Sequence, residues 1–201
     1  MIYLRAQWTV FLIALGFLTR IPIGNVDFTP QKLNKASRYF AVVGAIIGML
    51  CAGVYWLAQL VLSQEISILI SMIFGFYLTG GFHEDGLADV CDGLGGGYTQ
   101  KRKLERMKDS RVGTYGSLGL FRALFLKFLL LNELANPALA LIVMHTLSRT
   151  LASSIIFSII ETCKANEINS YNYLRYLFAN IHKAKTKQDL RSILPYNINP
   201  G

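Results

Sequence analysis

The chain has 201 residues, a length that fits one domain or a small membrane bundle. Only 16% of the residues are charged and 53% are hydrophobic, whereas about a quarter of the residues of a soluble protein carry a charge. The three cysteines, Cys51, Cys91 and Cys163, have no CxxC spacing, which argues against a disulfide framework or a zinc ribbon. The composition therefore favours a membrane protein.

Long uncharged runs predict the membrane spans in chain order. Residues 8–18 form a short apolar run, which predicts a re-entrant or interfacial helix. A signal peptide is rejected because Thr19, Arg20, Ile21 and Pro22 follow it instead of a small-residue cleavage site. A span needs about 20 residues, and the first long run alone has 24 uncharged positions. The predicted spans are residues 39–62, 66–82, 118–131 and 138–160.

These runs predict an all-α fold, a polytopic membrane helix bundle with about four spans and a short N-terminal helix. Residues 1–163 are expected to form a membrane-embedded domain with a functional loop at 80–117. Residues 164–201 are expected to form a polar, poorly packed tail. Gly44, Gly48 and Gly53 in the first long span favour close helix contact, although glycine is also simply frequent in membrane helices.

Seventeen of the 20 Lys and Arg residues lie outside the predicted spans, and their distribution predicts the orientation. They fall before the first span, after the second and after the last, while the short connections 63–65 and 132–137 carry none. The positive-inside rule then places the acidic loop on the cytoplasmic face of the inner membrane. Topology explains the net charge of +8, so we expect a lipid bilayer and not nucleic acid as the partner. Homo-oligomerisation is left open.

Residues 80–93 contain four acidic residues within nine positions. Carboxylates gathered at a membrane boundary repel one another and lose hydration, and a divalent cation compensates both costs. Hard oxygen ligands favour Mg²⁺, Mn²⁺ or Ca²⁺. In a helix, three of the four fall on one stripe, and the fourth, Glu84, lies about a quarter-turn away. The predicted metal ligands are Glu84, Asp85, Asp89 and Asp92.

Further polar residues predict substrate contacts. His83 is either a general base or a boundary residue. The loop that follows supplies Lys108, Asp109, Ser110 and Arg111, and carboxylates that hold a metal beside such cations are the components of phosphoryl transfer. His145 and Arg149 are four residues apart inside a span and would share a helix face. Charge inside a membrane is functional by default, so Arg149 is a candidate phosphate partner, or else pairs with a carboxylate of the bundle.

Three motifs carry a resemblance to a known family. GGFHEDGLADVCDGLGGG, MKDSRVGTYG and the N-terminal FLTRIP resemble the cobalamin synthases, the adenosylcobinamide-GDP ribazoletransferases, over roughly residues 11–160. The resemblance implies an integral membrane enzyme that uses Mg²⁺. It also implies that Glu84, Asp85, Asp89 and Asp92 hold the metal, while Asp109 and Arg111 match the second motif.

The reaction implied by the resemblance is the last step of cobalamin nucleotide-loop assembly. A hydroxyl of α-ribazole, or of its 5′-phosphate, attacks the phosphoryl group carried by cobinamide, and GMP leaves. Arg111 and Lys108 would hold oxygens of the diphosphate, while a carboxylate (Asp85, Asp89 or Asp92) or His83 accepts the proton. The family's Gly-Gly-x-Thr-Gly-Asp-like C-terminal motif has no match here, so we expect the chain alone to be inactive or nearly so.

The residue patterns alone leave two alternative functions open. A membrane alcohol phosphotransferase of phospholipid synthesis would need DGxxAR-type spacing, whereas Asp85 and Gly86 are followed by Leu87, Ala88 and Asp89. An ion-coupled transporter would have internal repeats and a site near the midplane, and the sequence contains neither signal.

Overall fold

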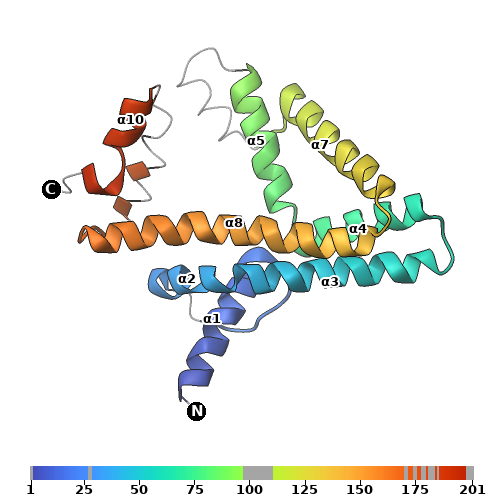
Figure 1. The fold of residues 1–201 in the computed structure, drawn as a ribbon, viewed down its shortest axis with the longest axis horizontal. Helices are drawn as coiled ribbons and strands as arrows, with labels where there is room; N and C mark the ends of the chain where they lie inside the picture. Colours follow the sequence, from blue (N-terminus) through green and yellow to red (C-terminus); the bar gives the residue numbers. More distant parts are fainter. Residues whose placement is uncertain are drawn as a thin grey trace.

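The computed structural model describes residues 2–26, 29–96, 111–169, 172–173, 176–177, 180, 184 and 186–197. These residues form helices joined by turns, with no strand among them (Figure 1). The all-α prediction is therefore confirmed. The helices are α1 (Ile2–Leu18), α2 (Pro30–Ala36), η1 (Ser37–Tyr39), α3 (Phe40–Gln59), α4 (Gln64–Thr79), α5 (Phe82–Gly96), α7 (Thr114–Glu133), α8 (Pro137–Ala165), α10 (Lys187–Ser192) and η3 (Pro195–Asn197).

Three helical segments are long and apolar enough to cross a membrane: η1 with α3 (Ser37–Gln59), α7 and α8. The next candidate, α4, has 16 residues and is about 24 Å long, shorter than the ~30 Å hydrocarbon core. It bends by 89° into α5, and only the bent pair passes as a fourth span. The predicted bundle of about four spans is confirmed in this form. The N-terminal α1, also apolar, is shorter than a span.

The centre of the bundle is α3, which runs along α8 and also packs against α4 (Figure 1). Glycine allows α3 and α8 to approach closely, because a Cβ at Gly48 would lie 2.6 Å from the Cα of Ile142. Gly44 also faces α8, whereas a Cβ at Gly53 would meet nothing within 4 Å. The predicted close contact is therefore correct for two of the three glycines. The contact between α3 and α4 includes a hydrogen bond of 2.8 Å, which the Ser71 hydroxyl of α4 donates to the Cys51 carbonyl of α3.

Two glycines end α4 and turn the chain into α5. Gly80 and Gly81 both have positive φ, at 72° and 69°, a conformation that glycine adopts without the steric cost of a Cβ. The end of α1 meets the same turn, since the Arg20 amide donates a hydrogen bond of 2.8 Å to the Leu78 carbonyl. The α4–α5 turn is thereby held against the N-terminal helix, and α5 packs mainly against α7 (Figure 1).

The C-terminal segment after residue 163 was expected to be a poorly packed tail, and this stays a prediction. Some of its described residues lie against the C-terminal end of α8. Apolar residues spaced among the polar ones form a small core, and the Tyr173 hydroxyl donates a hydrogen bond of 2.9 Å to the Ile193 carbonyl. α10 begins with a capping box of Thr186 and Asp189. The buried residues of this core are Cys163, Ile168, Tyr173, Leu177 and Ile193.

Candidate functional site

The acidic segment is helical, as the predicted carboxylate stripe requires. α5 starts directly after the glycine turn, where the Asp85 amide donates a hydrogen bond of 2.8 Å to the Gly81 carbonyl. Glu84 and Asp85 lie in its first turn, where the helix dipole favours negative charge. Burial increases along the helix: Asp85 is exposed, Asp89 is half-buried and Asp92 is buried. The carboxylates on α5 therefore have different environments.

Asp92 is fully engaged with the start of α7. Its two carboxylate oxygens accept hydrogen bonds from the Gly113 amide at 2.6 Å and the Gly116 amide at 2.8 Å. These amides belong to the first turn of α7, whose N–H groups have no partner within the helix. A Cβ at either glycine would clash with the Asp92 carboxylate. Asp92 thus fixes α5 against α7, a role that the sequence analysis missed.

No three His, Cys, Asp or Glu side chains within the described ranges form a group that could hold a metal ion. Mg²⁺ in proteins is often bound by only one or two carboxylates, with waters and substrate phosphates completing the shell. Glu84 and Asp85 line one cavity together, and Glu84 Oε2 is buried without a hydrogen-bond partner. This pair fits such a partial shell. Lys108, Asp109 and Ser110 lie outside the described residues.

The cavity that Glu84 and Asp85 share has a volume of about 480 Å³ and lies between the end of α1, the α4–α5 turn and the start of α7. Arg20 also lines this cavity, and its Nη2 donates a hydrogen bond of 3.5 Å to the Gly80 carbonyl. The cavity therefore combines two carboxylates and one guanidinium. The sequence analysis counted Arg20 only as a topological charge, although its place in the FLTRIP motif was a signal.

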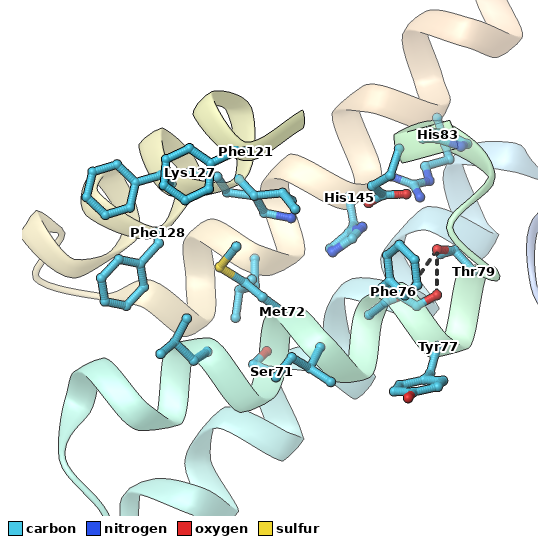
Figure 2. A pocket seen from close by; sticks show the side chains of 18 residues that line it. Ser71, Met72, Phe76, Tyr77, Thr79, His83, Phe121, Lys127, Phe128 and His145 are labelled. Atoms are coloured by element: carbon cyan, nitrogen blue, oxygen red, sulfur yellow. Dashed lines mark hydrogen bonds between the residues drawn. The ribbon is translucent and has the colours of Figure 1, made fainter. Parts of the chain in front are cut away.

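A larger cavity of about 660 Å³ lies between α4, α7 and α8. In Figure 2, Lys127 reaches into it from α7 and His145 from α8, opposite Met72 and Phe76 of α4. Arg149 lines the same cavity as His145, so the prediction that these two residues share a helix face is confirmed. The wall of this larger cavity is mostly apolar and aromatic. Lys127 lies within the predicted span 118–131, and the sequence analysis assigned it no role.

Three residues that line this larger cavity each have a buried polar atom without a hydrogen-bond partner. Within the described part of the chain, His145 Nδ1 and Arg149 Nε make no hydrogen bond, and neither does Glu84 Oε2. His145 is 8% exposed and Arg149 is 7% exposed. Arg149 uses one terminal nitrogen to donate a hydrogen bond of 2.7 Å to the Ser148 hydroxyl. Unsatisfied polar groups at this depth are unusual in a folded protein, which points to a ligand.

His83 lies at the α5 end of the larger cavity (Figure 2). An imidazole can accept a proton when it is neutral. The geometry is compatible with the general-base prediction for His83.

Comparison with known proteins identifies the chain's relatives. The family model described as cobalamin-5-phosphate synthase matches residues 10–181. An adenosylcobinamide-GDP ribazoletransferase of Shewanella woodyi is 55% identical over 161 residues, which cover 77% of this chain and 63% of the relative. That of Shewanella frigidimarina is 54% identical over 158 residues, covering 76% and 60%. That of Shewanella sp. strain W3-18-1 is 50% identical over 189 residues, covering 87% and 72%.

The chain spans about three fifths of the length of the first two of these relatives. No solved structure matches it. The family match covers most of the chain, including α5 with its acidic residues and the cavity-lining residues of α4, α7 and α8. The chain belongs to the cobalamin-5-phosphate synthase family.

Proposed function

We propose that this chain forms the membrane-embedded catalytic part of an adenosylcobinamide-GDP ribazoletransferase. The substrates are adenosylcobinamide-GDP and α-ribazole or its 5′-phosphate, and the products are adenosylcobalamin, or its 5′-phosphate, and GMP. The observation that carries the proposal is the pair Glu84 and Asp85, which line one cavity with Arg20. The relatives' names supply the reaction. The membrane alcohol phosphotransferase and the transporter are not favoured by these relatives.

The reaction transfers one phosphoryl group. The ribazole hydroxyl oxygen forms a bond to the phosphorus carried by cobinamide, the bond from that phosphorus to the GMP oxygen breaks, and GMP leaves. The hydroxyl proton passes to a carboxylate of α5 or to His83. Arg20 lies in the same cavity as Glu84 and Asp85, where its guanidinium can hold diphosphate oxygens. Lys108 and Arg111 are proposed for the same purpose from the loop that precedes α7.

The proposed cofactor is Mg²⁺, for which Glu84 and Asp85 would supply the carboxylates that line one cavity. When bound, it would neutralise charge on the diphosphate. Asp89 stays a predicted ligand, although it does not line this cavity and the three carboxylates do not form a metal-binding group among the described residues. Asp92 was predicted as a fourth ligand, but both its oxygens accept backbone amide hydrogen bonds, so we assign it to positioning α5 on α7. Asp109 and Ser110 remain proposed substrate contacts.

We propose that the α5 end of the bundle faces the cytoplasm, in the inner membrane. Arg20 contacts the α4–α5 turn through the Gly80 carbonyl, Lys35 precedes the first long span, and Arg38 lies in the first turn of that span. The turn between α3 and α4 contains no Lys or Arg. This asymmetry supports the cytoplasmic orientation through the positive-inside rule. It also gives the site access to nucleotide-activated substrate.

The test is a GMP-release assay on two proteins in lipid vesicles. One is this chain. The other is a chimera, in which the segment of this chain that matches the Shewanella woodyi relative replaces the corresponding segment of that relative. We expect the chimera to release GMP only when adenosylcobinamide-GDP, a ribazole acceptor and Mg²⁺ are all present. A folded chimera that releases no GMP under conditions in which the parent relative does would overturn the proposal.

A further inference from the structure

We infer that the 660 Å³ cavity between α4, α7 and α8 binds the acceptor nucleoside as its 5′-phosphate, with the aromatic base against the phenylalanines and the phosphate at Lys127 and Arg149. This inference rests on the proposed function and goes beyond it. It assigns a cavity to one substrate and gives Lys127 a role.

The charge of the cavity favours an anion. Lys127 and Arg149 contribute two positive charges to its lining, and Glu84 contributes one negative charge. The Glu84 carboxylate interacts electrostatically with both cations, but one carboxylate cannot neutralise two of them. An uncompensated charge at membrane depth is costly. A phosphate between Lys127 and Arg149 would remove that cost.

Two lining residues with an unpartnered buried atom indicate the end of the cavity at which the anion would lie. Arg149 is more than nine-tenths buried, and its Nε has no hydrogen-bond partner among the described residues. The neighbouring His145 is buried to a similar degree and has an unpartnered Nδ1. Figure 2 shows His145 and the amino end of Lys127 pointing into the same space. A phosphate there would accept hydrogen bonds from the guanidinium and the ammonium group.

The rest of the wall suits a flat apolar ring. It is largely apolar and includes the ring of Tyr77 and those of four phenylalanines, which are Phe76, Phe121, Phe125 and Phe128. Phe121 and Phe125 are stacked with their ring centroids 5.7 Å apart. Aromatic side chains bind planar rings by offset or edge contacts. A nucleoside with an apolar bicyclic base, such as α-ribazole, matches this combination better than a guanine nucleotide, whose base edge needs hydrogen-bond partners.

The size of the cavity allows the acceptor to bind and excludes adenosylcobinamide-GDP. Its volume lies within the range of about 300–1,000 Å³ that is typical of small-molecule sites. Adenosylcobinamide-GDP carries a corrin macrocycle and two nucleosides, which do not fit into it. The two cavities share the wall formed by Phe76, Thr79 and Glu84. An acceptor in the larger cavity would therefore lie next to a diphosphate bound beside Asp85.

The experiment measures binding without turnover, using the 201-residue chain in phosphatidylcholine nanodiscs and isothermal titration calorimetry. The probes are α-ribazole 5′-phosphate, α-ribazole and GMP. We expect the 5′-phosphate to bind at least about tenfold more tightly than the other two, because it alone combines the apolar base with an anion. Lys127→Met and Arg149→Gln should each weaken its binding by about tenfold or more. Phe121→Ala should weaken both ribazole probes equally.

The matched control is Arg122→Gln, which removes one positive charge from an exposed position of the same helix, outside the cavity lining. This variant should bind α-ribazole 5′-phosphate as tightly as the unmodified chain does. The inference falls if Lys127→Met binds the 5′-phosphate as tightly as the control does. It also falls if GMP binds as tightly with the same dependence on Lys127, or if phosphatidylglycerol in the nanodisc displaces the probe.

Failure of the inference and failure of the proposed function give different results. If the chimera releases GMP with an unchanged KM for the acceptor in the Lys127 and Arg149 variants, the proposed function stands and the cavity assignment is wrong. If the chimera releases no GMP but the chain binds the 5′-phosphate through Lys127, the proposed transfer reaction is wrong and the binding site stands.

Discussion

The carboxylate of Asp92 and the backbone amide of Gly116 lie 2.8 Å apart, which fastens α5 to the first turn of α7 across 24 positions of sequence. The Gly113 amide donates to the same carboxylate. One side chain thus fixes the angle at which the acidic helix leaves the bundle, and with it the positions of Asp85 and Glu84.

The first prediction concerns this junction. Asp92→Asn should lower the free energy of unfolding by about 1.5–3 kcal/mol, because hydrogen bonds to a charged acceptor are lost and an amide nitrogen would face a backbone N–H. Thermal unfolding in nanodiscs measures the change. Asp85→Asn is the control, since Asp85 is exposed and its change should stay within about 0.5 kcal/mol. Equal stabilities of the two variants would contradict the junction role.

The second prediction tests the contact between α3 and α8. Gly48→Ala should destabilise the bundle by about 1–3 kcal/mol, since the new methyl group would lie 2.6 Å from the Ile142 Cα and 3.0 Å from the Leu141 carbonyl oxygen. Gly53→Ala in the same helix has open space and should be neutral or slightly stabilising. Denaturant titration of both variants checks this. A Gly53 variant that is the less stable of the two would refute the packing argument.

The third prediction separates chemistry from folding. Asp85→Asn and Asp89→Asn, introduced into the chimera, should each abolish GMP release and leave thermal unfolding unchanged. Each substitution removes a carboxylate from the proposed Mg²⁺ shell. Full GMP release by both variants at saturating Mg²⁺ would take these two residues out of the site. Chelation with excess EDTA gives an independent check, and undiminished turnover in its presence would exclude the metal.

The fourth prediction is the orientation in the membrane. A single cysteine at Asn25, an exposed residue after α1, should be labelled by an impermeant maleimide only after the cytoplasmic face is opened. A cysteine at exposed Ser63, in the turn between α3 and α4, should be labelled in intact cells. The background carries Cys91→Ser, because Cys51 and Cys163 are buried but Cys91 is only half-buried. The reverse pattern would invert the topology.

Local patterns in the sequence were sufficient for the helices and the acidic stripe. Uncharged runs predicted the spans because a lipid environment requires both apolar side chains and internally satisfied backbone groups. Spacing alone predicted that His145 and Arg149 share a face, because the helical period relates residues four positions apart. In the C-terminal segment the apolar residues are too widely spaced to form one run in the sequence, and the described ones meet in a small core beside α8.

Contacts between distant segments were decided by the tertiary structure. No pattern near Asp92 in the sequence indicated that its carboxylate would accept hydrogen bonds from the start of α7. That interaction depends on how closely Gly113 and Gly116 let the two helices approach. Lys127 and Arg149, on separate helices, face one cavity only because α7 and α8 converge with α4 around it. Helix periodicity acts over a few residues, so the sequence by itself determines which helices form and which face is polar. The pairing of those faces follows from steric fit and charge between elements, which only the folded bundle brings together.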